Sequence, residues 1–153
     1  MGEVVNLQVH SPLGASGAYR WMVCPGSVSQ SRGIDDAESD HAALGTLAHA
    51  LGELCLVQSI EPWTKIGETN MSKHTTEDGE LLMVDKNMAD AVHQYIHFIE
   101  QWHPDWQRSQ FAWVEKRFHC PSIHRLFYGT VDFAHVTMNS SKTGENILDV
   151  WDY

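Results

Sequence analysis

Two aspartates close strand-like stretches in the last part of the chain, and their residue type and placement suit a metal site. Asp132 lies in the run 129–133 (GTVDF), and Asp152 lies in the terminal run 147–153 (ILDVWDY). Carboxylates on neighbouring antiparallel strands can converge, because adjacent strands lie about 4.8 Å apart. Oxygen ligands at that separation suit a hard divalent cation such as Mg²⁺. The pattern predicts a metal-dependent nuclease site, in which the cation activates water and stabilises the leaving alkoxide of a phosphodiester.

Strand alternation refines this prediction and also supplies an alternative to it. Asp132 shares its expected face with Leu126, Tyr128, Thr130 and Ala134. An aspartate among such neighbours is costly to bury without a cation, a hydrogen-bonded partner or water. Glu115, on the strand before, is a third candidate for the same patch. The alternative is that strand-end aspartates cap turns or face solvent. Asp149 falls on the opposite face from Asp152, and we expect it to face solvent.

A helix is expected at 40–58, and it carries a histidine and a glutamate on one face. Its apolar residues recur at three- and four-residue spacing, as in an amphipathic helix. Gly45 and Gly52 interrupt it at a cost of roughly 1 kcal/mol each, and such glycines often permit close approach of another backbone. His49 and Glu53 are four residues apart and share one face. A lone helical histidine is more often a satisfied surface or core group than a ligand.

Two further helices and an irregular stretch complete the expected front half. A short helix capped by Ser16 is expected to run to Val23 and to stop at the Cys24–Ser27 segment, since proline disfavours a helical residue before it. A loop is expected at 29–39. The apolar stripe at 84–102 predicts a second long helix from Glu80 to Trp102, with a core face.

Three strand candidates follow at 111–119, 126–137 and 147–153, the last two joined by a polar turn at 139–146. Their order predicts an α+β fold in which N-terminal helices precede a three-stranded antiparallel meander. A chain of 153 residues is about one domain, so we expect a single domain over 1–153 with a flexible lead-in at 1–15. The terminal strand is an unpaired edge, and we expect self-association unless another segment or a partner covers it.

Composition narrows the class of protein. The chain has no run of 18 apolar residues and no basic-then-apolar leader, so neither a membrane span nor secretion is expected. The three widely spaced cysteines, Cys24, Cys55 and Cys120, fit a reducing cytoplasm and lack the close pairs of a zinc site. The formal net charge of −10 counts against a simple nucleic-acid-binding module. It counts less against a nuclease, whose cation attracts phosphate.

The order of motifs resembles a known superfamily. The stretch ALGTLAHA at 43–50, followed by Glu53, is similar to the G-T-x-x-H helix of RecB-like exonucleases, which belong to the PD-(D/E)xK, or restriction-endonuclease-like, superfamily. Residues 16–27 resemble the start of an uncharacterised phage-associated branch. The segment WVEKR at 113–117 looks like the strand before the motif aspartate. GTVDF and the final VWDY look like the two acid motifs.

This resemblance implies an αβββαβ core, of which the chain would be the front part, and Mg²⁺- or Mn²⁺-dependent cutting of DNA in the cytoplasm of a bacterial or phage-infected cell. It implies that His49, Asp132 and Asp152 hold metal, helped by the backbone carbonyl of Tyr153. Glu115 would belong to the outer shell, with supporting positions at Glu53, Thr130 and Tyr153. In some relatives an iron–sulfur cluster is present, and Cys24 stands where its first ligand would be, with the other ligands outside this chain.

The lysine of the motif would come directly after Tyr153, where the sequence ends. We therefore expect a C-terminally truncated domain with weak catalysis or none, in which metal binding survives. The partners expected are DNA and either the rest of the same protein or a protein that covers the terminal strand. The non-enzymatic alternative is an inactive nuclease fold that serves as an interaction or regulatory protein.

Overall fold

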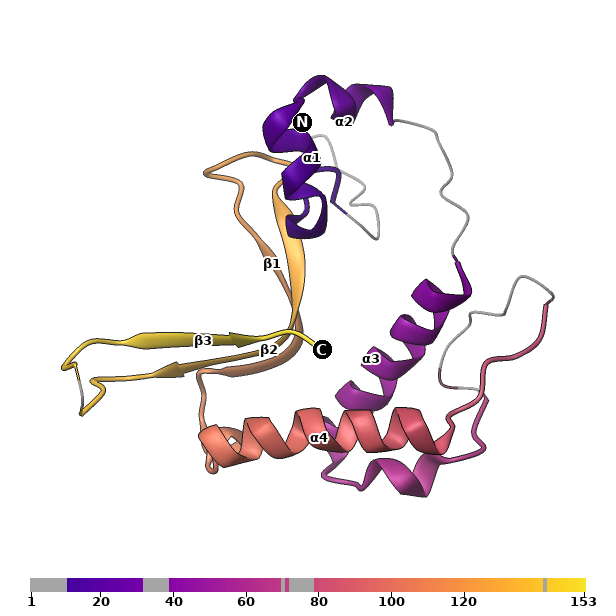
Figure 1. Cartoon of the computed structure of the whole chain (residues 1–153). Helices are drawn as coiled ribbons and strands as arrows, with labels where there is room; N and C mark the ends of the chain where they lie inside the picture. The colour runs from indigo at the N-terminus through magenta and orange to yellow at the C-terminus, as the bar shows by residue number, and fades with distance from the viewer. Residues whose placement is uncertain (1–10, 32–38, 70, 72–78, 142) are drawn as a thin grey trace, which may run out of the picture. The chain divides into compact units, whose positions relative to one another are not determined.

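The computed structural model describes residues 11–31, 39–69, 71, 79–141 and 143–153 of the chain (Figure 1). The chain divides into two compact units. The smaller unit comprises Met1–Asp36 and Lys116–Thr130, and the larger unit comprises Ala37–Glu115 and Val131–Tyr153. Within the described residues, no helix has both the length and the apolar character needed to cross a membrane.

The helix α3, Asp40–Gln58, has the bounds that its apolar spacing predicts. It begins where the Ser39 hydroxyl accepts a hydrogen bond from the backbone N–H of Ala42 at 3.3 Å, which satisfies one of the free N–H groups of the first turn. It ends at Ser59, whose left-handed backbone (φ 54°) breaks the helical hydrogen-bond ladder. The helix predicted at 40–58 is therefore confirmed.

The helix α4 spans Lys86–Trp102, so the predicted end is confirmed and the predicted start at Glu80 is wrong. Asp85 is extended and its side chain accepts the N–H of Met88 at 2.8 Å, which makes it the N-terminal cap. The preceding residues Leu82 and Val84 are buried in a non-helical segment. Periodicity alone cannot tell such a buried non-helical run from a helical turn.

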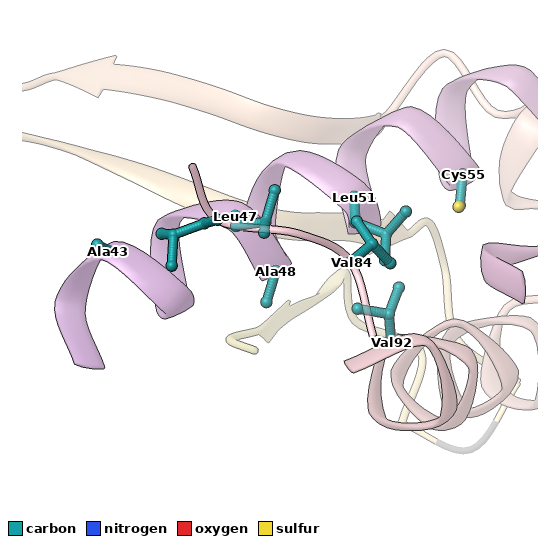
Figure 2. Close-up of a cluster of buried hydrophobic side chains, with 8 residues drawn as sticks. Ala43, Leu47, Ala48, Leu51, Cys55, Val84 and Val92 are labelled. Atoms are coloured by element: carbon teal, nitrogen blue, oxygen red, sulfur yellow. The ribbon is translucent and has the colours of Figure 1, made fainter. Parts of the chain in front are cut away.

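The two long helices enclose the first hydrophobic cluster (Figure 2). Leu47 and Leu51 of α3 are fully buried together with Val84 and with Val92 of α4. A Cβ at Gly52 would lie 4.0 Å from the side chains of Tyr95 and Val92, and one at Gly45 would meet nothing within 4 Å. Neither glycine is therefore needed for the close backbone approach that the sequence suggested.

The three strands form one antiparallel sheet in the order β1-β2-β3, as expected. Their bounds are Ala112–His119, Tyr128–Thr137 and Ile147–Trp151. The first two begin one and two residues later than predicted, and the third ends before Asp152 and Tyr153. Strands β2 and β3 pair from Thr137 opposite Ile147 to Phe133 opposite Trp151.

A second cluster packs the sheet against the helices of the larger unit. Phe133 of β2 is fully buried against Leu56 of α3, Ile99 of α4 and Trp106 of the short 3₁₀ helix η3, Trp106–Arg108. The Trp106 and Phe133 rings meet edge to face at 5.3 Å. A second 3₁₀ helix, η2, spans Pro62–Lys65 beside these elements. Packing against α3, α4 and η3 fixes the position of β2 relative to α3.

The faces of β3 are assigned differently from the sequence expectation. Leu148 and Val150 are 61% and 56% exposed, so the face that they share is the open one. Asp149 lies on the packed face with Trp151, and its Oδ2 is 3.8 Å from Nε2 of the buried His103. The prediction that Asp149 simply faces solvent is wrong, because alternation shows which residues share a face but not which face is covered.

In its described residues, the smaller unit has three short helical elements: η1, Ala15–Gly17; α1, Ala18–Val23; and α2, Gly26–Gln30. Helix α1 begins after Gly17 without a side-chain cap, so the predicted cap at Ser16 is wrong. Ser29 and Gln30, predicted as loop, belong to α2. The Ser11 hydroxyl bonds to the carbonyl of Leu126. Residues 1–10 of the expected lead-in and 32–38 of the expected loop lie outside the described residues.

Candidate metal centre

Three side chains from three elements of the larger unit converge. Nδ1 of His49, on α3, lies 3.2 Å from Oδ2 of Asp132, on β2, and 3.5 Å from Oε1 of Glu115, on β1. Each residue offers one potential ligand atom, and these atoms all lie within 4.8 Å of one another. One imidazole nitrogen and two carboxylates suit a divalent ion such as Mn²⁺, which accepts both nitrogen and oxygen ligands.

The backbone at Glu115 is strained. Its φ is +46°, in the left-handed region, although it lies within a strand and is not a glycine. The left-handed conformation costs an L-residue about 1–2 kcal/mol. Such strain persists only where the surrounding structure enforces it, and it concentrates at functional positions. Here it accompanies the placement of the Glu115 carboxylate beside His49.

Asp132 is held in place by the end of the chain that follows β3. It is 9% exposed, and its Oδ2 accepts a hydrogen bond from the backbone N–H of Tyr153 at 2.7 Å. Burial works to raise the pKa of Asp132, but the hydrogen bonds from His49 and from Tyr153 outweigh it and hold the pKa below its ordinary value. Asp132 is therefore a carboxylate near neutral pH, which is the form that binds metal.

The two carboxylates favour the protonated form of His49. Its hydrogen bond to Asp132, and then that to Glu115, raise the pKa of the imidazole to about 10 against the opposing effect of burial. The proton on His49 thus neutralises part of the carboxylate charge that a cation would otherwise neutralise. A metal that uses Nδ1 as a ligand must displace this proton, because only neutral imidazole coordinates.

Asp152 and Tyr153 lie next to this group, and their expected roles as metal ligands stay predictions. Asp152 lies beside the Asp132 carboxyl, and its partial burial together with the interaction with Asp132 raises the pKa of Asp152. Glu115, rather than Asp152, completes the closely spaced set with His49. The described contact of Tyr153 is through its N–H, whereas its carbonyl was the expected ligand.

A small cavity of about 10 Å³ opens beside the carboxylates, roughly the room for one water molecule. The residues that line it are Ala48, His49, Gly52, Glu53, Leu56, Tyr95, Glu115, Asp132 and Tyr153. Burial, followed by the charge of Glu115, raises the pKa of Glu53, which faces the same space. The supporting position predicted for Glu53 therefore lies at the site.

Tyr95 is the site residue that the sequence reasoning missed. Its hydroxyl is buried without a hydrogen-bond partner in the described part of the chain, and it borders the cavity. Burial and the charges of Asp132, Glu115 and Asp152 raise its pKa. The residue sits in the apolar stripe of α4, where only its polar tip distinguishes it from core residues.

The two remaining predicted residues belong to the smaller unit. Thr130 is exposed on β2, and Cys24 is an exposed free thiol after α1. Cys55 and Cys120 are also free. The iron–sulfur role suggested for Cys24 stays a prediction, and so does the supporting role of Thr130.

Residues 10–153 match the family described as "Protein of unknown function (DUF2800)". The chain belongs to this family. The matched range contains His49, Glu115 and Asp132, so the whole candidate centre lies within the part that defines DUF2800. No solved structure matches the chain. The family description names no activity. A functional proposal must therefore be based on the geometry of the centre.

Proposed function

We propose that the chain carries the metal centre of a divalent-metal-dependent DNA nuclease of the PD-(D/E)xK type, on the RecB-like branch. The observation that carries the proposal is the convergence of His49, Glu115 and Asp132 from α3, β1 and β2. These residues come from three of the motifs that resemble that superfamily. His49 and Asp132 are more than 80 positions apart in the sequence. A chance cluster of surface acids has no reason to follow that motif order.

In this proposal Glu115 and Asp132 supply oxygen ligands and His49 supplies a nitrogen ligand to Mg²⁺ or Mn²⁺. The bound ion would polarise a phosphodiester oxygen and activate water. The N–H of Tyr153 keeps one oxygen of Asp132 oriented, and the Asp152 carboxyl beside it is a further acid for the same ion. The Tyr95 hydroxyl is a donor at the edge of the cavity.

Calorimetric titration with Mn²⁺, alongside degradation of linear DNA, tests the proposal. Asp132→Asn is expected to lower Mn²⁺ affinity at least tenfold and to abolish any cleavage. Asp149→Asn is the matched control, because it makes the same substitution on the same sheet outside the cavity. Equal Mn²⁺ affinity in the wild type and Asp132→Asn would rule the centre out.

A second candidate is an inactive nuclease fold that binds metal and serves as an interaction protein. The observation in its favour is that the described residues lining the cavity include no Lys or Arg. Nuclease sites of this kind use a cationic side chain to stabilise developing charge. Saturable Mn²⁺ binding with no degradation of single- or double-stranded DNA would favour this candidate over the first.

A further inference from the structure

The smaller unit differs in charge from the rest of the chain. Its described ranges, 11–31 and 116–130, contain four cationic residues and no Asp or Glu; the four are Arg20, Lys116, Arg117 and Arg125. The whole chain has 10 Lys and Arg against 20 Asp and Glu, so the net charge of −10 hides a local excess of positive charge. Local clustering of this kind, rather than overall charge, marks a surface for a polyanion.

The same unit contains an apolar groove of about 430 Å³. Its walls come from the segment before η1, from α1, α2 and the residue Pro25 between them, and from the β1–β2 connection. The lining residues are Leu13, Trp21, Met22, Pro25, Val28, Ile123, His124 and Phe127. Met22 and Ile123 are each 69% exposed. Apolar side chains are left open at this groove, and monomeric proteins usually keep such exposure for binding.

The aromatic walls of the groove are fixed. The indole N–H of Trp21 donates to the Gly14 carbonyl at 3.0 Å, and the Trp21 and Phe127 rings meet edge to face at 6.5 Å. Two residues that line the groove have an arginine as a neighbour in the sequence: Arg20 precedes Trp21, and Arg125 follows His124. Both arginines are exposed, and among the described residues neither has a carboxylate partner.

A third cation of the smaller unit lies against an aromatic ring. The Arg117 guanidinium lies 5.0 Å from the centre of the Tyr128 ring. A guanidinium in this arrangement presents its charge in a fixed direction, since the ring attracts its face. The smaller unit thus offers preorganised positive charge together with aromatic and apolar surface.

From these observations we infer that this face of the smaller unit binds single-stranded nucleic acid, with bases against the groove and phosphates at Arg20 and Arg125. Positive charge along a groove with aromatic walls is the common plan of single-strand binding, because the faces of unpaired bases stack and the backbone pairs with cations. A duplex hides those faces. The inference rests on the proposed nuclease function in taking a nucleic acid, rather than another polyanion, as the partner.

Fluorescence anisotropy with a labelled 20-nucleotide oligothymidylate tests the inference on the full chain, in EDTA so that the metal centre plays no part. Arg20→Glu/Arg125→Glu is expected to weaken binding at least tenfold. It is also expected to reduce the slope of log affinity against log salt by about 1.4, because each lost phosphate contact removes about 0.7 on a single strand. Arg108→Glu, an exposed arginine of the larger unit, is the control for charge reversal and should stay within twofold of the wild type.

Three outcomes would overturn the inference: an equal loss in the control and the double variant, tighter binding to a matched duplex than to the single strand, or arginine-dependent binding to vesicles of phosphatidylglycerol without binding to the oligonucleotide. Circular dichroism of the double variant checks that it is folded, and Arg20→Gln/Arg125→Gln gives a milder second version. Asp132→Asn separates this inference from the proposed function. It should retain oligonucleotide binding in EDTA, whereas the double variant should retain Mn²⁺ affinity.

Discussion

His49 and Asp132 form a hydrogen-bonded ion pair, Nδ1 to Oδ2 at 3.2 Å, between α3 and β2 of the larger unit. The pair joins the long helix to the middle strand of the sheet, and Glu115 adds a second carboxylate to it. In the metal-free protein it is a structural contact. On the proposed function, the same atoms become ligands when a cation arrives.

Without added metal, the ion pair is expected to contribute to stability only within a range of pH, with an upper and a lower limit. The pKa of His49 is raised to about 10, so its contribution is full below the unfolded value of about 6.5 and is lost as the pH rises toward 10. The pKa of Asp132 is lowered, so its contribution is present above about 3.9 and is lost as the pH falls further. The difference in Tm between the wild type and His49→Gln, measured in EDTA, should therefore shrink from pH 7 to pH 10.5. A difference that is unchanged across this range would argue against the pair.

Metal binding should release a proton near neutral pH. His49 must lose its proton to coordinate, so Mn²⁺ affinity is expected to rise about tenfold for each pH unit between 6.5 and 8.5. Calorimetry in two buffers of different ionisation enthalpy measures the proton released. His49→Ala should bind more weakly and without this pH dependence, while His93→Ala, a half-exposed histidine of α4, should behave as the wild type. Affinity that does not change with pH would remove His49 from the ligand set.

The left-handed backbone of Glu115 predicts an inverted order of substitutions. In an ordinary strand, a protein with glycine at a given position is less stable than one with alanine by roughly 0.5–1 kcal/mol. At φ +46° the order should reverse, with Glu115→Gly more stable than Glu115→Ala by about 1 kcal/mol, since only glycine is free of the left-handed cost. Urea denaturation of both variants measures the difference. If alanine is the more stable of the two, the strain is absent. Both variants should lose Mn²⁺ affinity.

Gly45→Ala is expected to stabilise the chain by up to about 1 kcal/mol. A Cβ at Gly45 would have open space, and the position is inside α3, where alanine is the better helix former. Gly67→Ala is the contrasting control, because Gly67 has φ +91° and an added side chain there is strained. Thermal unfolding of the two variants should shift in opposite directions. Destabilisation by Gly45→Ala would mean that the glycine has a role outside the helix itself.

The exposed face of β3 predicts self-association. Strand β3 is an edge of the sheet, and Leu148 and Val150 leave its open face apolar. Leu148→Lys/Val150→Lys should reduce any dimer or aggregate seen by size-exclusion chromatography with little change in Tm, because both side chains are more than half exposed. Ile147→Lys, on the packed face of the same strand, should instead lower Tm. Unchanged elution of the double variant would assign the association to another surface.

The sequence alone determined the elements whose signals are local. The bounds of α3 follow from apolar spacing between Ser39 and Ser59, and the strand order follows from β-branched runs separated by polar turns. The motif resemblance also singled out His49, Asp132 and Asp152 as metal ligands, with Glu115 in the outer shell. These features depend on residues near one another in the chain, where spacing and side-chain type carry most of the information.

Tertiary structure decided the rest. Only the tertiary structure shows that Leu82 and Val84 pack against α3 from outside the helix, and only the covered face of the sheet places Asp149 beside His103. The close spacing of His49, Glu115 and Asp132 depends on how α3, β1 and β2 pack together, and only the packing of α4 puts Tyr95 at the same cavity. Each of these outcomes arises from contacts between segments far apart in the chain, which sequence spacing does not encode.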